Sequence, residues 1–247
     1  KEAVVSVMKK VENMTLEPYT KKENNAPLID KELKPAAIKK TFEIAGVKDA
    51  KGYILENEAK IIVLPTSYSQ DQIVFSAFSK GGKSLVKTED LASAEIATTI
   101  ARSSGLGNFD NIGLKEKLTG KVAQAAPFIG ENTQGFQGSS NKADFETMLQ
   151  MVYLSFESPR FDPNIFNILK EQYKNRLETI KKDNGNAFKD SIDLANSNHS
   201  QRTFIFNEKF LETIDLKKAE NIYRDRIKNA GDFTFIFVGN IPEKALE

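Results

Sequence analysis

The spacing of apolar and polar residues predicts strands early in the chain and mostly helices later. Residues 1–13 place apolar side chains at helical spacing, and residues 14–36 show little periodicity, so a short helix and then a connector are expected. From residue 37 the pattern becomes extended, as in β-strands. Three strands are expected in succession, at residues 52–55, 60–64 and 72–78. Turns at 56–59 and 65–70 would join them in pairs.

The middle of the chain carries the signals of two helices and a hairpin. A helix is expected at 89–103, with Thr88 as its N-cap and Gly105 at the left-handed position that ends many helices. The inner face of this helix carries small or aliphatic residues, namely Ala92, Ile96, Ala97, Ile100 and Ala101. Such a face suits close packing on a sheet. A second short helix is expected at 111–118, followed by a β-hairpin at 121–138.

Helical spacing dominates the remainder until a final strand. Helices are expected at 142–157, 163–182, 187–196 and 216–230. Pro159 ends the first of them, and Asp162 followed by Pro163 begins the second as an N-cap with proline in the first turn. Residues 233–238 are apolar on both faces and predict an inner strand.

This order of elements predicts an α+β fold. We expect a mainly antiparallel sheet with helices packed on one face, because strands and helices come in blocks rather than in strict alternation. The predicted organisation is an N-terminal helix and linker over 1–36 and a single α+β domain over 37–247.

Composition removes several classes of function. The 247 residues include no Cys and one His, which excludes disulfide scaffolds, Cys-based zinc fingers, thiol enzymes, iron–sulfur proteins and a His-rich zinc site within the chain. A balance of 35 basic and 34 acidic residues gives no excess charge for nucleic-acid binding. Apolar runs stay well below the ~18 residues of a membrane span. The chain begins at Lys1 without a signal-peptide pattern, so we expect an excised segment or a processed product.

The segment Lys80-Gly-Gly-Lys-Ser84 resembles part of a phosphate-binding loop. The Walker spacing requires a glycine at position 77, where this chain has Ala77, and the following helix begins too late to face a phosphate at Gly82. We therefore interpret the segment as a loop between a strand and a helix. It supplies no predicted cofactor-binding residue.

Three further residues could take part in catalysis by their type, but none lies in a catalytic motif. His199 lies in a polar stretch and is expected at an exposed loop or helix end, with its role left open. Glu171 and Glu178 lie opposite the apolar stripe of their helix, among lysines, which is typical of a solvated helix face. The residues by themselves therefore predict a packed α+β domain without a catalytic constellation.

Several stretches taken together resemble the pitrilysin/insulinase family of zinc metallopeptidases, the inverzincins. They are Asp71-Gln-Ile-Val-Phe-Ser-Ala-Phe-Ser-Lys-Gly-Gly-Lys-Ser84, Ser104-Gly-Leu-Gly-Asn-Phe109, Leu118-Thr-Gly-Lys121, Gly135-Phe-Gln-Gly-Ser-Ser140, Asp144-Phe-Glu-Thr-Met-Leu-Gln-Met-Val-Tyr-Leu-Ser-Phe156, Pro159-Arg-Phe-Asp162, Asp215-Leu-Lys-Lys-Ala219 and Asp232-Phe-Thr-Phe-Ile-Phe-Val-Gly-Asn240. The similarity covers residues 50–242 and is greatest to the C-terminal half of long bacterial, periplasmic-type members. It implies the repeat fold of these peptidases, which the mitochondrial processing peptidases share.

In that family one unit carries H-x-x-E-H on a helix, with two zinc ligands and the general base. The matching helix here, residues 91–100, contains no His. The resemblance thus implies a degenerate unit with no catalytic, cofactor-binding or metal-binding residues of its own. Zinc would belong to a catalytic unit elsewhere in the parent protein, and this chain alone is expected to be inactive.

The resemblance leaves two functions open. The first is a non-catalytic domain that shapes the substrate chamber of a zinc metalloendopeptidase. The second is an assembly or peptide-binding subunit of the same fold that works with a separate active subunit. The expected partners are an N-terminal catalytic half or a homologous active subunit, and peptide substrates, with no nucleic acid and no membrane span. The family suggests a periplasmic or cell-envelope location, which the chain itself does not determine.

Overall fold

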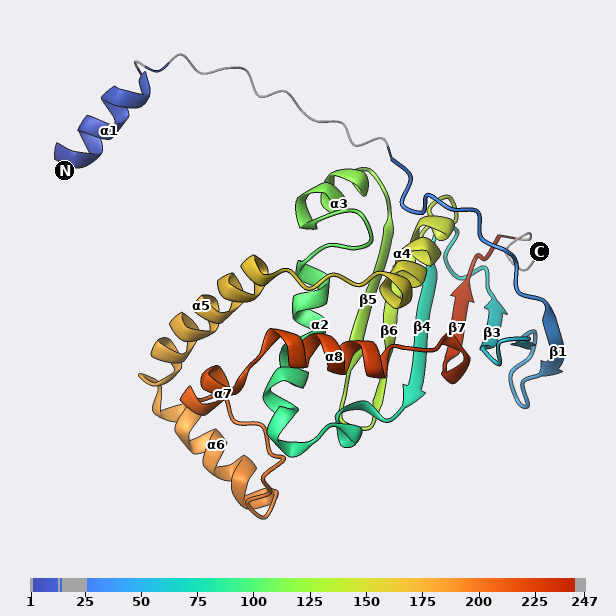
Figure 1. Ribbon diagram of the computed structural model, residues 1–247. Helices are drawn as coiled ribbons and strands as arrows, with labels where there is room; N and C mark the ends of the chain where they lie inside the picture. Colours follow the sequence, from blue (N-terminus) through green and yellow to red (C-terminus); the bar gives the residue numbers. More distant parts are fainter. Residues whose placement is uncertain (1, 13, 15–25, 243–247) are drawn as a thin grey trace.

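The computed structural model describes residues 2–12, 14 and 26–242 (Figure 1). The described residues form one seven-stranded sheet in the order β1-β2-β3-β7-β4-β6-β5. The strands are β1 (Ile38–Glu43), β2 (Lys51–Leu55), β3 (Lys60–Pro65), β4 (Ile73–Lys80), β5 (Ala123–Ile129), β6 (Thr133–Ser140) and β7 (Thr234–Gly239). β3 and β7 run parallel, and the other neighbouring strands are antiparallel. The predicted mixed fold with a mainly antiparallel sheet is confirmed.

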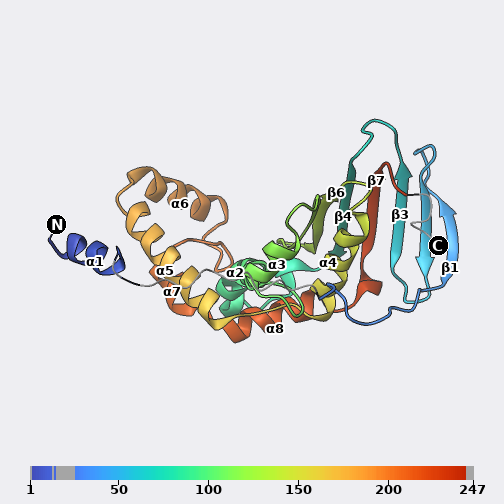
Figure 2. The same ribbon diagram turned by 90° about the horizontal axis from the view of Figure 1, so that it is seen from above.

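Some of the helices pack beside this sheet and others extend away from it (Figure 2). The helices are α1 (Glu2–Glu12), α2 (Leu91–Ser103), α3 (Asn111–Lys117), α4 (Phe145–Glu157), α5 (Pro163–Ile180), α6 (Asn184–Asn196), α7 (Glu208–Thr213) and α8 (Leu216–Arg226). α4 lies beside β5 and β6, and α2 contacts both β5 and α8. α5, α6 and α7 extend away from the sheet beyond α2 (Figure 2).

The helices face one side of the sheet because the strands alternate in burial. Along β4, Ile73, Phe75 and Ala77 are buried, whereas Val74 and Phe78 on the other face are 49% and 41% exposed. The buried face joins a single large cluster with residues of α2, α4, α7 and α8. This cluster includes Phe75, Ile96, Ile100, Phe136, Met148, Val152, Phe210, Tyr223, Phe233 and Phe237.

β7 is the inner strand that its two apolar faces predicted, but its position corrects the expected strand order. The turn at 65–70 was expected to pair the strands on either side of it. Instead β7 lies between β3 and β4, with Val63 opposite Phe237 and Phe237 opposite Phe75. Phe75 and Phe237 stack with ring centroids 5.0 Å apart. In this position both edges of the aromatic strand β7 pair with neighbouring strands. A direct β3–β4 hairpin would leave β7 without an inner position in the sheet.

Local capping explains several helix ends. The Asp162 carboxylate accepts a 2.7 Å hydrogen bond from Asn164 N at the start of α5, as predicted. Gly105 has the expected positive φ, +96°, just after α2. The predicted N-cap Thr88 is wrong, because Thr88 begins a 3-10 turn, Thr88–Asp90, and its side chain does not cap α2.

Other boundaries also differ from expectation. The last predicted helix, 216–230, ends as α8 at Arg226 and is followed by a separate 3-10 turn, Ala230–Asp232. The short helix α7 was not predicted, because only Phe210 of its six residues is buried and no apolar stripe marks it. In the expected connector, Leu28 is buried against Phe109, while residues 15–25 lie outside the described part of the chain.

Candidate functional site

The Gly-Gly-Lys-Ser segment after β4 holds the hairpin that joins β5 to β6. The backbone N–H groups of residues 81–84 all donate to the end of this hairpin. Their acceptors are Asn132 O at 2.8 Å, Gln134 Oε1 at 2.5 Å, Gly130 O at 2.8 Å and Glu131 O at 2.8 Å. A phosphate-binding loop must present such donors to the phosphate. Because they are used within the fold, the geometry agrees with our interpretation of the segment as a strand–helix loop.

Glycine is required at position 82 of this segment. Gly82 has φ +59°, and a Cβ at this residue would lie 2.3 Å from Gly130 O. Any side chain there would collide with the hairpin backbone, so the glycine permits the close approach of the two chain segments. Ser84 closes the turn, because its Oγ donates to Gly81 O at 2.5 Å.

The side chain of Lys83 ties this segment to α2 and to the hairpin. Its ammonium forms ion pairs with Glu95 of α2 and with Glu131, the latter at 2.6 Å, and the residue is only 8% exposed. Burial by itself lowers the pKa of Lys83, but the hydrogen bonds and charges of Glu131 and Glu95 outweigh it and leave the pKa above its ordinary value. A lysine held in this way is a charged structural link rather than a base.

A second basic residue, from a distant part of the chain, donates to the backbone at and just after the same segment. Arg202, in the loop between α6 and α7, donates to Lys83 O at 2.6 Å and to Val86 O at 3.1 Å. Sequence reasoning missed Arg202, Glu95 and Glu131, because their partners are distant in the chain and no spacing marks them. We call this set, with Lys83, the Lys83 cluster.

A cavity of about 690 Å³ opens beside the Lys83 cluster. The walls include Leu91, Glu95, His199, Arg202 and Lys209. His199 is exposed, as expected, and adopts φ +52° at the end of α6. Its backbone N–H donates to Leu194 O at 2.8 Å. The structure therefore brings His199 near the cluster but gives its ring no partner, within the described ranges, that would orient it as a catalyst.

Glu171 and Glu178 lie on the exposed side of α5, and Glu178 forms an i,i+3 pair with Lys181 at 3.2 Å.

Within residues 2–12, 14 and 26–242, no three His, Asp or Glu side chains lie close enough together to hold a metal ion. In the same ranges, no helix has the length and apolar character needed to cross a membrane.

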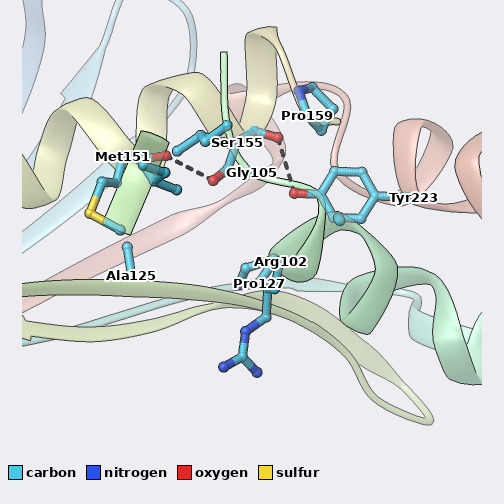
Figure 3. Close-up of a pocket in the computed structure, with 11 residues that line it drawn as sticks. Arg102, Gly105, Ala125, Pro127, Met151, Ser155, Pro159 and Tyr223 are labelled. Atoms are coloured by element: carbon cyan, nitrogen blue, oxygen red, sulfur yellow. Dashed lines mark hydrogen bonds between the residues drawn. The ribbon is translucent and has the colours of Figure 1, made fainter. Parts of the chain in front are cut away.

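A smaller cavity, of about 110 Å³, lies between α2, α3, α4, α8 and the edge strand β5. Figure 3 shows Met151, Ser155 and Tyr223 on one side and Ala125 and Pro127 on another. The Tyr223 hydroxyl donates to Ser155 O at 3.1 Å, and burial raises the pKa of this phenol well above its usual range. Tyr223 therefore stays neutral and acts as a buried hydrogen-bond donor.

Comparison with known proteins shows which proteins this chain is similar to. The chain is 21% identical over 189 residues to the probable zinc protease PqqL of Haemophilus influenzae, a match that covers 76% of this chain and 20% of that protein. No family model matches the chain.

Two solved structures share the fold. The periplasmic protease PqqL from Escherichia coli superposes with a TM-score of 0.76 at 18% identity, over 99% of this chain and 27% of that one. A mutant of the ferredoxin protease FusC, solved with Arabidopsis ferredoxin, gives a TM-score of 0.72 at 12% identity, over 98% of this chain and 26% of that one. The chain thus spans a fifth to about a quarter of the length of these proteins. The low-identity homology to a zinc protease and the shared fold support the resemblance of this chain to the pitrilysin/insulinase family.

Proposed function

We propose that this chain is a non-catalytic domain of a zinc metalloendopeptidase of the pitrilysin/insulinase type, which shapes the chamber that receives peptide substrates. In this proposal the zinc belongs to a separate catalytic unit, either in the N-terminal half of a longer polypeptide or in a homologous active subunit. The periplasmic relative and the homology to a zinc protease support this assignment and a periplasmic location.

The observation that carries the proposal is the ion pair between Lys83 and Glu95. Glu95 is the acidic residue on the helix that matches the H-x-x-E-H helix of catalytic units, and its carboxylate is bound by the Lys83 ammonium. A carboxylate neutralised by an internal cation is a poor metal ligand and a poor general base. This helix therefore serves to hold the fold together.

The open face of the sheet supports a role in lining a chamber. Phe78 and Val74 remain exposed there, and the half-buried Ile62, Ile236 and Ser76 lie in one row across three neighbouring strands. An apolar sheet face that the domain's own core leaves exposed suits contact with extended peptide segments or with another domain.

Metal analysis and peptidase assays test the proposal directly. The purified chain is dialysed against a weak chelator, its zinc content is measured, and it is incubated with unfolded polypeptides and short peptides. We expect no stoichiometric zinc and no cleavage, because a catalytic zinc site needs about three protein ligands and an open position. One tightly bound zinc per chain, with peptidase activity that a strong chelator abolishes, would overturn the proposal.

A complementation experiment tests the positive part of the proposal. The catalytic half of the full-length protein is assayed alone and after addition of this chain. We expect the added chain to raise the cleavage of long peptides, because closing the chamber creates substrate contacts that the catalytic half lacks. A matched chain with the open face altered, Phe78→Glu, should fold but raise cleavage less. Equal stimulation by both chains would contradict a role for this face.

A further inference from the structure

The smaller cavity has the size and chemistry to receive one apolar side chain. Its volume is about 110 Å³, and much of its lining is apolar: Leu114, Ala125, Pro127, Met151 and Tyr223 (Figure 3). A cavity of about 150 Å³ lined by apolar residues binds benzene. A space of 110 Å³ therefore matches a four-carbon group such as the side chain of leucine.

The buried polar side-chain atoms around this cavity already have partners. The Tyr223 hydroxyl donates to Ser155 O, and Ser155 Oγ donates to Met151 O at 2.8 Å. Among the described residues, the one buried side-chain polar atom without a partner is Ser140 Oγ, which does not line this cavity. The cavity thus offers little to hold water and favours an apolar occupant.

A free cation marks the rim of the cavity. Arg102 of α2 is exposed, and its side chain extends past Pro127, away from Tyr223 (Figure 3). Within the part of the chain that the structure describes, no side chain or backbone group pairs with this guanidinium. A guanidinium presents a planar fork of donors that matches a carboxylate. A ligand with an apolar group in the cavity and a carboxylate outside it would satisfy both features.

The neighbouring edge of the sheet is poorly suited to bind a peptide by strand addition. The hairpin closes with a bond from Gly130 N to Thr133 O at 2.8 Å, and Pro127 lies opposite Phe136. In the alternation of an antiparallel pair, this register directs the backbone groups of Pro127 outward. The missing N–H of the proline therefore interrupts the exposed edge. Recognition here must come from a side chain and an end group rather than from a backbone ladder.

We propose that this cavity binds the C-terminal residue of a peptide, with its apolar side chain inside the cavity and its free carboxylate on Arg102. The inference rests on the proposed function only for the source of the peptide. Cleavage in a protease chamber creates new C-terminal carboxylates. The binding itself depends only on groups of this chain.

Titration of the isotopically labelled chain with short peptides, followed by amide NMR, tests the proposal. The probe is acetyl-Ala-Ala-Leu with a free carboxylate, compared with its C-terminal amide, with acetyl-Ala-Ala-Gly and with hexanoate. We expect saturable shifts at Gly105, Leu114 and Met151 with the leucine acid, and weaker binding of the other three probes. Absence of saturation at millimolar peptide, or equal affinity for the amide, would overturn the proposal. Tighter binding of hexanoate would instead identify a site for acyl carboxylates and would also overturn it.

Variants test the two parts of the site, the Arg102 guanidinium and the apolar cavity, separately. Arg102→Gln should weaken binding of the acid about threefold to fivefold, as expected for a solvent-exposed ion pair, and leave the amide unchanged. Lys115→Gln, which removes a nearby exposed cation outside the cavity, is the matched control and should change neither. Ala125→Leu should fill the cavity and abolish binding, and Leu114→Phe serves the same purpose if that variant does not fold. Undiminished binding by a folded, filled variant would refute the site. None of these measurements uses zinc or cleavage, so failure here and failure of the proposed function are distinguishable.

Discussion

Replacing Lys83 with methionine tests whether the Lys83 cluster stabilises the fold. The substitution keeps an unbranched apolar side chain and removes only the ammonium. Glu95 and Glu131, which both bind this ammonium, would then face each other without a cation between them.

The structure sets the size of the expected effect. Removing one partner of a buried ion pair costs about 3–5 kcal/mol. The side chains of Glu95 and Glu131 are 24% and 73% exposed, so both carboxylates can regain some contact with water. We therefore expect Lys83→Met to lower the free energy of unfolding by about 2 kcal/mol. For a chain of this length that corresponds to a fall in Tm of about 4–8 °C.

Urea unfolding followed by circular dichroism measures this loss. Lys80→Met, at an exposed position at the end of β4, is the matched control and should change stability by less than about 0.5 kcal/mol. Glu131→Gln should cost less than about 1 kcal/mol, because Glu131 is mostly exposed. A Lys83→Met variant as stable as the Lys80→Met control would refute the reasoning.

The pH dependence gives an independent check. The pKa of Lys83 is raised in the folded state, so its contribution is fully present below the unfolded pKa of about 10.4 and is lost as pH rises through the folded value. The stability difference between the parent and Lys83→Met should therefore be constant from pH 7 to about pH 9 and shrink above about pH 10.4. A difference that shrinks between pH 7 and pH 9 would show that another group is responsible.

Three further predictions concern the sheet and the Gly-Gly-Lys-Ser segment. Phe235→Asp places a charge in inner strand β7 beside Phe75 and should cost about 4 kcal/mol or prevent folding; a variant that melts within a few degrees of the parent would contradict this. Gly82→Ala should destabilise the chain by about 2 kcal/mol or more, whereas Gly46→Ala, with a positive φ but open space around its Cβ, should cost about 1 kcal/mol; similar losses would show that the hairpin contact is unimportant. Calorimetry should find no ATP binding to the parent or to Lys83→Ala, and micromolar affinity in the parent alone would overturn our interpretation of the segment.

Much of the fold could be predicted from the sequence, because the signals involved are local. The apolar repeat of 3.6 residues marked α2, α4 and α5, and apolar residues on both faces marked β7 as an inner strand. Asp162 followed by Pro163 predicted the start of α5, because capping depends on residues that are adjacent in the chain. The motif spacing also argued against a nucleotide site at Gly82. The degenerate, non-catalytic character of the unit remains a prediction.

The tertiary structure alone decided where these elements meet. Periodicity predicts that β7 is buried but not that it separates β3 from β4, because the order of strands depends on how the whole core packs. The Lys83 cluster joins residues 12, 48 and 119 positions apart, a distance along the chain over which no pattern of spacing carries information. The cavity beside Arg102 likewise requires four helices and an edge strand to be in place. Local patterns determine elements because neighbouring residues share one backbone geometry, whereas sites arise from contacts that only the folded chain brings together.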